Sequence, residues 1–400
     1  MPIDRSRIPE LAAYYRRHLL DEVMPFWEQR TRDPQGGYLT HFDYEDGRLM
    51  GTQKNMWCHG RQLYMLSALY NHLGRDPKWL ALAKHGRDFI VKHGYAGNGA
   101  WHYELDREGR VTNNARSLFT DSFVLSGLCE YAVASGSRED MPLIEATYDR
   151  YERGLRTPGF TEYHHFTFDP RFRYHGPHFI VLAMALSTRP ALGDTRIRPL
   201  VDYALEQVLH VFSKDKQQAL FEMVNLDGSV SNEPQAQILN PGHAMESLWF
   251  CMEEGIHRND AAIIRRAAEV MDWSYRIGHD KEYGGIVAYT GPGVAPPPKE
   301  LQVNQFNERW DDKSWWVLSE SLYGVALTAL TTDDAVMWDR FLDLHAYCRD
   351  KMRNPAIGGE WHLYLKRDGS VAERPGINFI RAAFHIPRAL MKLLILLEKN

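Results

Sequence analysis

The chain has 400 residues, with 47 lysines and arginines against 52 aspartates and glutamates. This balance supplies no basic excess for a phosphate backbone, which argues against a nucleic-acid partner. Hydrophobic residues make up 44% of the chain, as in globular proteins that bury a large core.

The N-terminal residues carry charges throughout and lack the apolar core of a signal peptide. No stretch reaches the roughly eighteen apolar residues that a membrane span requires. We therefore expect no membrane partner and a cytoplasmic protein. Four cysteines lie far apart without a CxxC pair, so we expect reduced thiols in helices: Cys58, Cys129, Cys251 and Cys348.

Strand-like segments that end in turn residues recur along the chain. Most combine aromatic or β-branched residues with an Asp-Gly or Glu-Gly type turn, which is typical of β-hairpins. Regular spacing of this kind indicates a repeat architecture. The six segments start 60 to 75 residues apart, at Gly36, Gly99, Gly159, Ala219, Gly284 and Gly359.

Two amphipathic helices are expected between successive hairpins. The clearest ranges are Gly51 to Leu73 with Pro77 to His93, and Pro241 to Gly255 with Asp260 to Ile277. Helices near Ile8 to Trp27 and from Pro387 to Glu398 bring the total to twelve, and these terminal helices can pair.

The pattern predicts an all-α fold, an (α/α)6 barrel with short β-hairpins at one end, formed by residues 1–400 as a single domain. A linear helical solenoid has the same period, but it needs polar capping helices, and the last helix is strongly apolar. In each repeat, the helix that follows the hairpin is expected to line the interior.

Arg61 lies on the first of these inner helices, among aromatic residues that include Trp57 and Tyr64. Its guanidinium could bind hydroxyls or stabilise the charge of an enediolate. The alternatives are a buried ion pair for Arg61 and a core position for Trp57.

The third repeat contains several histidines, of which His178 opens an inner helix and is the best candidate for contact with a substrate. Together with His164, His165 and His175 it raises the question of a metal site. No HExxH pair or similar rigid helical motif is present, so we expect no metal. Glu222 in the next hairpin is a further candidate for substrate contact.

His243 follows Asn240 and Pro241, which suit the cap and the first position of a helix. The positive end of the helix dipole disfavours a cationic ring there, and a neutral imidazole is what a general base requires. Glu246, three residues on, could orient the ring or bind a substrate hydroxyl. An ordinary first-turn histidine is the alternative.

Trp315 and Trp316 are adjacent on an inner helix, so both cannot face the interior. One could stack on a sugar ring while the other packs. Glu320 on the same helix could bind a sugar hydroxyl or pair with Lys313.

His385 repeats the arrangement of His243, because it stands just before Pro387 at the start of the last helix. In a closed barrel this helix is two inner helices beyond that of His243, so the two rings could face one another. Such a pair could remove a proton next to a carbonyl from one face and return it to the other. A structural cap is the alternative. No phosphate loop or serine nucleophile elbow occurs, and we expect no cofactor.

With these residues in view, the chain resembles the N-acylglucosamine 2-epimerase superfamily over nearly its whole length. The matching segments are KNMWCHGRQLYM, DREGR followed by FTDSFVLSGLCEYA, ILNPGHAMESLWF, DKSWW with Glu320, and GEWHLYLKRDGSV followed by FHIPRAL. The resemblance implies an (α/α)6 barrel, metal-free proton transfer on an open-chain sugar, His243 and His385 as the acid/base pair, Arg61 on the C1 or C2 oxygens, and Glu246 assisting His243.

The NPGH and FHIPRAL segments favour epimerisation of an N-acylglucosamine to an N-acylmannosamine. Two differences bear on the sugar: Leu318 replaces a polar residue of the WWxHxE pattern, and Phe379 stands near the place of a family tryptophan. An insert at 290–310 is expected to remodel the rim of the funnel.

The closest alternatives are aldose–ketose isomerisation of mannose and fructose, and 2-epimerisation of mannose or cellobiose. More distant are a glycoside hydrolase that uses Glu222, Glu246 or Glu320, and a protein that binds sugar without catalysis. A homodimer is an expectation only.

Overall fold

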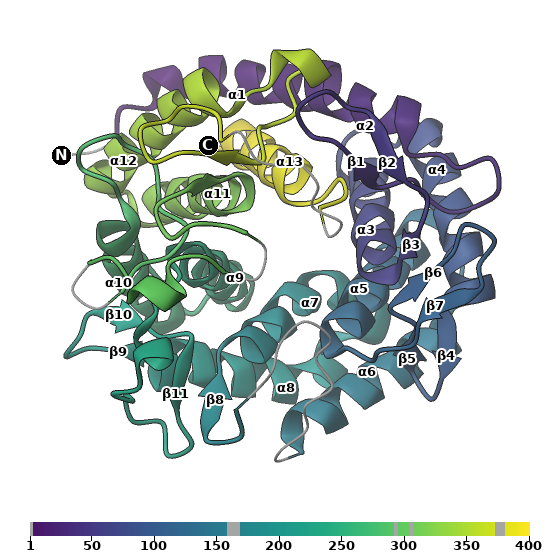
Figure 1. Cartoon of the computed structure of the whole chain (residues 1–400), viewed down its shortest axis with the longest axis horizontal. Helices are drawn as coiled ribbons and strands as arrows, with labels where there is room; N and C mark the ends of the chain where they lie inside the picture. The colour runs from purple at the N-terminus through teal and green to yellow at the C-terminus, as the bar shows by residue number, and fades with distance from the viewer. Residues whose placement is uncertain (1–2, 158–168, 292–294, 305–306, 373–380) are drawn as a thin grey trace.

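The computed structural model describes residues 3–157, 169–291, 295–304, 307–372 and 381–400, and these residues form two concentric rings of helices (Figure 1). The inner ring consists of α3 (Met56–His72), α5 (Leu118–Ser135), α7 (Gly176–Leu192), α9 (Pro241–Arg258), α11 (Trp315–Thr332) and α13 (His385–Glu398). The outer ring consists of α1 (Ile8–Arg17) with α2 (Met24–Arg30), then α4 (Pro77–Phe89), α6 (Met141–Arg156), α8 (Asp194–Glu206), α10 (Ala261–Gly278) and α12 (Ala335–Tyr347).

Each inner helix packs against its inner neighbours and against the outer helix that follows it in the chain. The last helix, α13, contacts α11 before it, α3 at the start of the ring, and α1 on the outside. The terminal helices therefore pair as expected, and the (α/α)6 barrel is confirmed.

The inner and outer helices differ in how their sequences are buried. Nearly every residue of α11 is buried, including Ser319, Ser321 and Thr328, whereas α10 buries one face only. Caps fix where inner helices begin: the side chain of Asn55 accepts from the Cys58 backbone N–H, and that of Asn240 accepts from the His243 backbone N–H.

The short strands lie at one end of the barrel, as predicted, but several pair between repeats rather than within one hairpin. The strand before α3, β3 (Lys54–Asn55), pairs with β6 (Glu104–Leu105), which pairs with β7 (Val111–Asn113). In the same way β8 (Phe172–Tyr174) pairs with β11 (Met223–Asn225), and β12 (Lys313–Ser314) with β13 (Tyr364–Leu365).

The remaining strands pair locally. These are β1 (His41–Phe42) with β2 (Leu49–Gly51), β4 (Tyr95–Gly97) with β5 (Ala100–Trp101), and β9 (Ser213–Lys214) with β10 (Ala219–Leu220). The segment from Gly284 forms isolated bridges, such as Leu239 with Thr290. The first part of the segment from Gly159 lies outside the described residues.

Two buried ion-pair triads tie hairpins of neighbouring repeats together. The Lys54 ammonium lies 2.5 Å from Asp33, and the Arg107 guanidinium lies 2.9 Å from the same carboxylate. On the opposite arc, Asp280 accepts in the same way from Lys313 at 3.0 Å and from Arg367 at 2.9 Å. Since each lysine stands directly before an inner helix, each triad holds the start of that helix against two hairpins.

All four cysteines are buried and free, in agreement with the prediction of reduced thiols. Within the described part of the chain, no helix combines the length and apolarity needed to cross a membrane.

The closest packing between inner helices occurs where α3 crosses α5, at Gly60. A Cβ atom on Gly60 would lie 2.4 Å from the carbonyl carbon of Phe123 and 2.5 Å from the backbone nitrogen of Val124. We expect Gly60→Ala to lower the free energy of unfolding by about 1–3 kcal/mol, because backbone atoms cannot yield as a side chain can. Thermal and denaturant unfolding measure this change.

Gly324→Ala in α11 is the matched control. Its added Cβ meets first the terminal methyl group of Met271, at 2.9 Å, which can move aside. Equal stability losses in the two variants would contradict the close-approach argument.

Candidate active site

His243 lies in the first turn of α9, where its ring is held by Glu222 from the loop between β10 and β11. Nδ1 of His243 lies 3.0 Å from a carboxylate oxygen of Glu222. Burial alone would lower the pKa of His243, but the neighbouring carboxylates, Glu222 foremost, raise it above its usual value. These carboxylates act against the neutral ring that the helix dipole was expected to favour, because a full negative charge in contact outweighs a partial one.

Glu222 also contacts a second histidine that the sequence did not single out as a functional residue. Nδ1 of His175 lies 3.2 Å from the other carboxylate oxygen, and His175 is fully buried. Its position directly before Gly176 and Pro177, at the start of α7, is the signal that could have identified it.

His385 opens α13 and has its own carboxylate partner, Glu320 of α11. Nδ1 of His385 lies 2.7 Å from Glu320, whose other oxygen accepts from the indole N–H of Trp249 at 2.9 Å. Burial lowers the pKa of His385 to about 3, against the opposing effect of Glu320. Glu320 is 1% exposed, so it holds protein groups instead of the sugar hydroxyl or Lys313 that the sequence suggested.

Arg388, one turn beyond His385, connects the two carboxylates of this cluster. Its Nη2 donates to Glu246 at 2.5 Å and to Glu320 at 2.8 Å. Glu246 therefore forms this ion pair in place of the predicted contact with His243. Burial and the charge of Glu320 raise the pKa of Glu246 to about 6.

The same cluster brings three potential metal ligands together, since atoms of Glu246, Glu320 and His385 lie within 4.8 Å of one another. The Arg388 guanidinium already supplies a positive charge to both carboxylates. Its presence disfavours a divalent cation at this place.

Trp316 adjoins both histidines. Its ring centroid is 4.9 Å from that of His243 and 6.1 Å from that of His385. Gly242 permits this position, because a Cβ there would lie 2.8 Å from the Trp316 ring.

Trp315 points elsewhere, as adjacent helix positions must. Its buried ring packs edge-to-face on Tyr364 and beneath the Arg381 guanidinium. Of the two predicted platforms, only Trp316 adjoins the histidines.

Arg61 is buried in an aromatic cage on α3. Its guanidinium carbon lies 4.1 Å from the ring centre of Phe123, 4.7 Å from that of Phe384 and 5.3 Å from that of Trp57. Burial lowers the pKa of Arg61 to about 10, so the group remains cationic, and its charge acts on His385. The buried indole N–H of Trp57 has no hydrogen-bond partner among the described residues.

His178 does not reach the cluster. Its Nδ1 lies 2.8 Å from the backbone carbonyl oxygen of Tyr174, and its Nε2 lies 3.4 Å from the Tyr203 hydroxyl of α8. Tyr174 of β8 and Tyr203 of α8 engage the two ring nitrogens, so the contact of His178 with a substrate stays a prediction. His164 and His165 lie outside the described residues.

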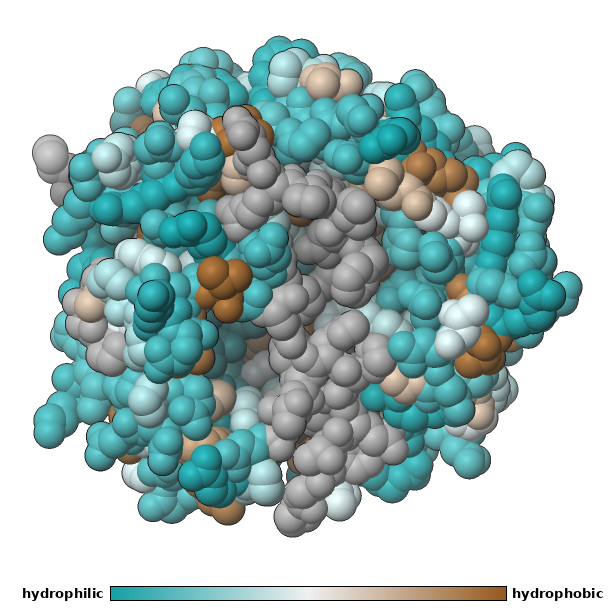
Figure 2. Space-filling view, in the orientation of Figure 1, coloured by the Kyte–Doolittle hydropathy of each residue, from teal (hydrophilic) through white to brown (hydrophobic). Residues whose placement is uncertain are grey.

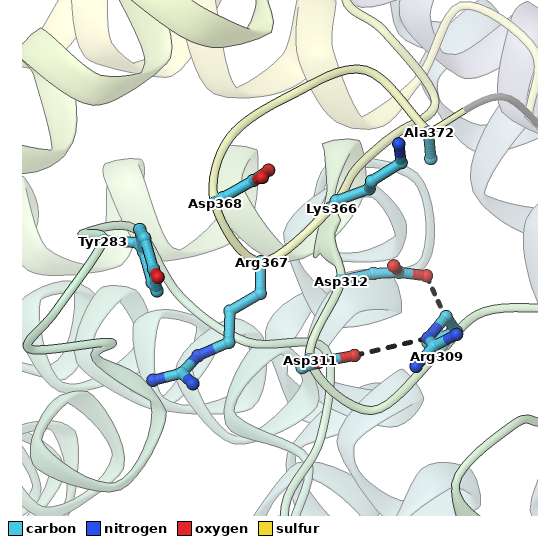
Figure 3. A pocket seen from close by; sticks show the side chains of 8 residues that line it. All are labelled: Tyr283, Arg309, Asp311, Asp312, Lys366, Arg367, Asp368 and Ala372. Carbon is cyan, nitrogen blue, oxygen red and sulfur yellow. Dashed lines mark hydrogen bonds and ion pairs between the residues drawn. The ribbon is translucent and has the colours of Figure 1, made fainter.

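A pocket of about 600 Å³ lies at the hairpin end, between the loop before β12 and the turn after β13 (Figure 3). Its two arginines have carboxylate partners: the Arg309 guanidinium pairs with Asp311, and Arg367 pairs with Asp280. The backbone N–H of Arg309 also donates to Asp312. This end of the barrel is mostly hydrophilic and is hollowed near its middle (Figure 2).

The arrangement brings two imidazoles close to one indole, that of Trp316. Each has Nδ1 turned to a carboxylate, which leaves Nε2 as the nitrogen available for proton transfer. The opposite pKa shifts favour a cationic His243 and a neutral His385.

The chain matches the family model described as N-acylglucosamine 2-epimerase (GlcNAc 2-epimerase) over residues 37–377. It is 27% identical to the N-acylglucosamine 2-epimerase of Bos taurus, covering 93% of this chain and 87% of that protein.

Its fold is similar to solved structures of lower identity. The cellobiose 2-epimerase from Bacillus thermoamylovorans B4167 aligns with a TM-score of 0.82 at 16% identity, covering 97% of this chain and 99% of that one. A D-mannose isomerase aligns with a TM-score of 0.78 at 18% identity, covering 99% of each chain. The chain therefore belongs to the N-acylglucosamine 2-epimerase family, whose members are carbohydrate epimerases and so isomerases.

Proposed function

We propose that this protein interconverts an N-acylglucosamine and an N-acylmannosamine by moving the proton at C2 of the open-chain sugar. The observation that carries the proposal is the pair of histidines around Trp316, each oriented by its own carboxylate. Inversion at C2 requires one proton-transfer group on each face of that carbon, and two imidazoles beside one indole could supply such a pair.

In one direction, neutral His385 removes the C2 proton through Nε2, and cationic His243 delivers a proton to the opposite face. In the reverse direction the roles exchange. Glu320 and Glu222 hold the Nδ1–H tautomers and stabilise each imidazolium as it forms. The difference between the two pKa values prepares one acid and one base before the substrate arrives.

Removal of the C2 proton places negative charge on the C1 oxygen. The Arg61 guanidinium, held among aromatic rings, would stabilise this enediolate without reorganising. Trp316 would stack on the apolar face of the sugar, and the Trp57 indole N–H is a further donor for a substrate oxygen.

The acylated hexosamine is the preferred substrate because the curated relative from Bos taurus with that name matches over 93% of this chain. Isomerisation of a free hexose begins with the same deprotonation and differs in the carbon that receives the proton. A glycoside hydrolase is disfavoured because Glu222, Glu246 and Glu320 already hold a histidine or an arginine.

We further propose that residues 1–400 act as one catalytic domain without metal or cofactor. Four free, buried cysteines support a reducing compartment such as the cytoplasm. A homodimer stays a prediction, which the solution mass would test.

The first experiment follows deuterium incorporation by proton NMR in deuterated water with N-acetylglucosamine, N-acetylmannosamine, mannose, fructose and cellobiose. We expect exchange at C2 of the acylated pair, and its loss by at least about a hundredfold in His243→Ala and His385→Ala. His178→Ala is the matched control, since its ring faces α8. Deuterium at C1 of fructose would instead indicate an isomerase, and released reducing sugar would indicate a hydrolase.

The second prediction concerns pH. Because Glu222 raises the pKa of His243, Glu222→Gln should lower it, so that His243 loses its proton at a lower pH. In the direction that uses His243 as acid, the alkaline limb of kcat/KM should move to lower pH. Rates in both directions across pH 5–9 measure this shift.

The exposed Glu233, downstream of the same hairpin, provides the control Glu233→Gln, which should leave the pH profile unchanged. An unshifted alkaline limb in both directions for Glu222→Gln would count against the assignment of His243.

A further inference from the structure

One buried carboxyl group near the catalytic pair has no role in the mechanism above. Glu308 belongs to the insert at 290–310, between α10 and α11, and is 4% exposed. Glutamate side chains are rarely buried without a charged partner. The described residues provide Glu308 with no ion pair within 4 Å.

Asn304 fixes the position of Glu308. The Asn304 side-chain amide donates to Oε2 of Glu308 at 2.8 Å, and the Glu308 backbone N–H donates to Oδ1 of Asn304 at 3.1 Å. The backbone N–H of Asn304 also donates to the carbonyl oxygen of Glu308 at 2.9 Å, beside the bridge between Val303 and Arg309. One of these three hydrogen bonds is to the carboxyl group, and the other two fix the backbone of Glu308 beside Asn304.

The other carboxyl oxygen, Oε1, is buried and has no partner with hydrogen-bonding geometry among the described residues. The hydroxyl of Ser314, directly before Trp315, is also buried without a partner of hydrogen-bonding geometry, and it lies close enough to Glu308 to lower the pKa of that carboxyl group. A buried acceptor without a well-aligned donor costs free energy, which makes Oε1 a candidate acceptor for a donor on a ligand.

Glu308 lies close enough to His243 for the two groups to act on each other through their charges. Its charge contributes to the raised pKa of His243, and His243 in turn acts on Glu308. Burial raises the pKa of Glu308 to about 6, while the nearby Ser314 and Asn304 oppose the shift and Asp312 adds to it. At neutral pH the group is therefore mainly a carboxylate, an acceptor for a hydroxyl donor.

We propose that Oε1 of Glu308 binds a sugar hydroxyl at C3, C4 or C6, so that the insert determines which sugar the site accepts. The inference rests on the proposed function and deepens it. The hydroxyl groups of a neutral sugar donate to carboxylates, whereas a carboxylate, sulfonate or phosphate on the substrate would repel Glu308.

The wider charge balance supports a neutral substrate. Four carboxyl groups belong to this cluster, those of Glu222, Glu246, Glu308 and Glu320, against the guanidinium groups of Arg61 and Arg388 and the imidazolium of His243. Each of these three cations already has a role, at the enediolate, in the carboxylate cluster or in proton transfer, and the carboxyl groups outnumber them.

The test is a double-mutant cycle between protein and substrate. kcat and KM are measured for wild type, Glu308→Ala and Glu308→Gln with the best substrate and with its 3-, 4- and 6-deoxy analogues. In wild type, we expect one deoxy analogue to lose about tenfold or more in kcat/KM, mainly through KM, since a hydrogen bond to a charged group is lost.

In Glu308→Ala, kcat/KM for the parent sugar should fall by a similar factor. This variant should then have nearly the same kcat/KM for the parent sugar and for that deoxy analogue. Glu308→Gln keeps the shape and an acceptor oxygen, so it should discriminate between the two sugars with a smaller ratio. Glu300→Ala, which removes an exposed carboxylate from the same insert, should behave as wild type.

If Glu308 acts only on the charge of His243, its removal will shift the pH profile of kcat equally for every sugar and couple to no hydroxyl. That result would overturn the proposal, as would coupling of equal size in Glu300→Ala. Should Glu308→Ala not fold, Glu308→Gln decides by the same ratio. If the wild type exchanges deuterium but Glu308 shows no coupling to a sugar hydroxyl, this inference alone is overturned. If the wild type exchanges deuterium with none of the sugars, the proposed function is overturned.

Discussion

Closure of the ring by α13 is the constraint on which the remaining structure depends. Apolar residues of this helix, including Leu390, Leu393 and Leu394, are almost completely buried where it meets α1, α11 and α3. A buried leucine stabilises a fold by about 1.5–3 kcal/mol relative to an exposed one. Because His385 and Arg388 occupy the first turns of the same helix, the packing that closes the barrel also positions them.

This packing creates an electrostatic requirement. Arg388 is 4% exposed, and a buried guanidinium without an anion would be strongly destabilising. Glu246 and Glu320 meet the requirement from α9 and α11, so three inner helices are joined through one cation. The same carboxylate of Glu320 then orients His385, which links the stability of the ring to the geometry of the site.

The neighbours of the two histidines thus shift their pKa values in opposite directions. His385 lies against the positive charges of Arg61 and Arg388 and is deeply buried, which favours the neutral ring. His243 is one-third exposed at its side chain and contacts Glu222, which favours the cation. The hairpin end supplies two of the carboxylates that raise the pKa of His243, because Glu222 and Glu308 come from segments that precede inner helices, whereas Arg61 and Arg388 lie on inner helices.

The sequence by itself determined the helices, their order and their grouping into a ring, since helical periodicity and caps such as Asn240 are local properties. It also indicated His243, His385 and Arg61, each at or near the start of an inner helix. Only the tertiary structure decided their partners. Glu246 turns to Arg388, 142 residues away, and not to His243 three residues before it. His175, and not His178, contacts Glu222, and Glu222 becomes the partner of His243, because the side that a ring or carboxylate faces depends on contacts between distant repeats. Helical spacing fixes which residues share a face, but burial in a shared core decides which charges must meet.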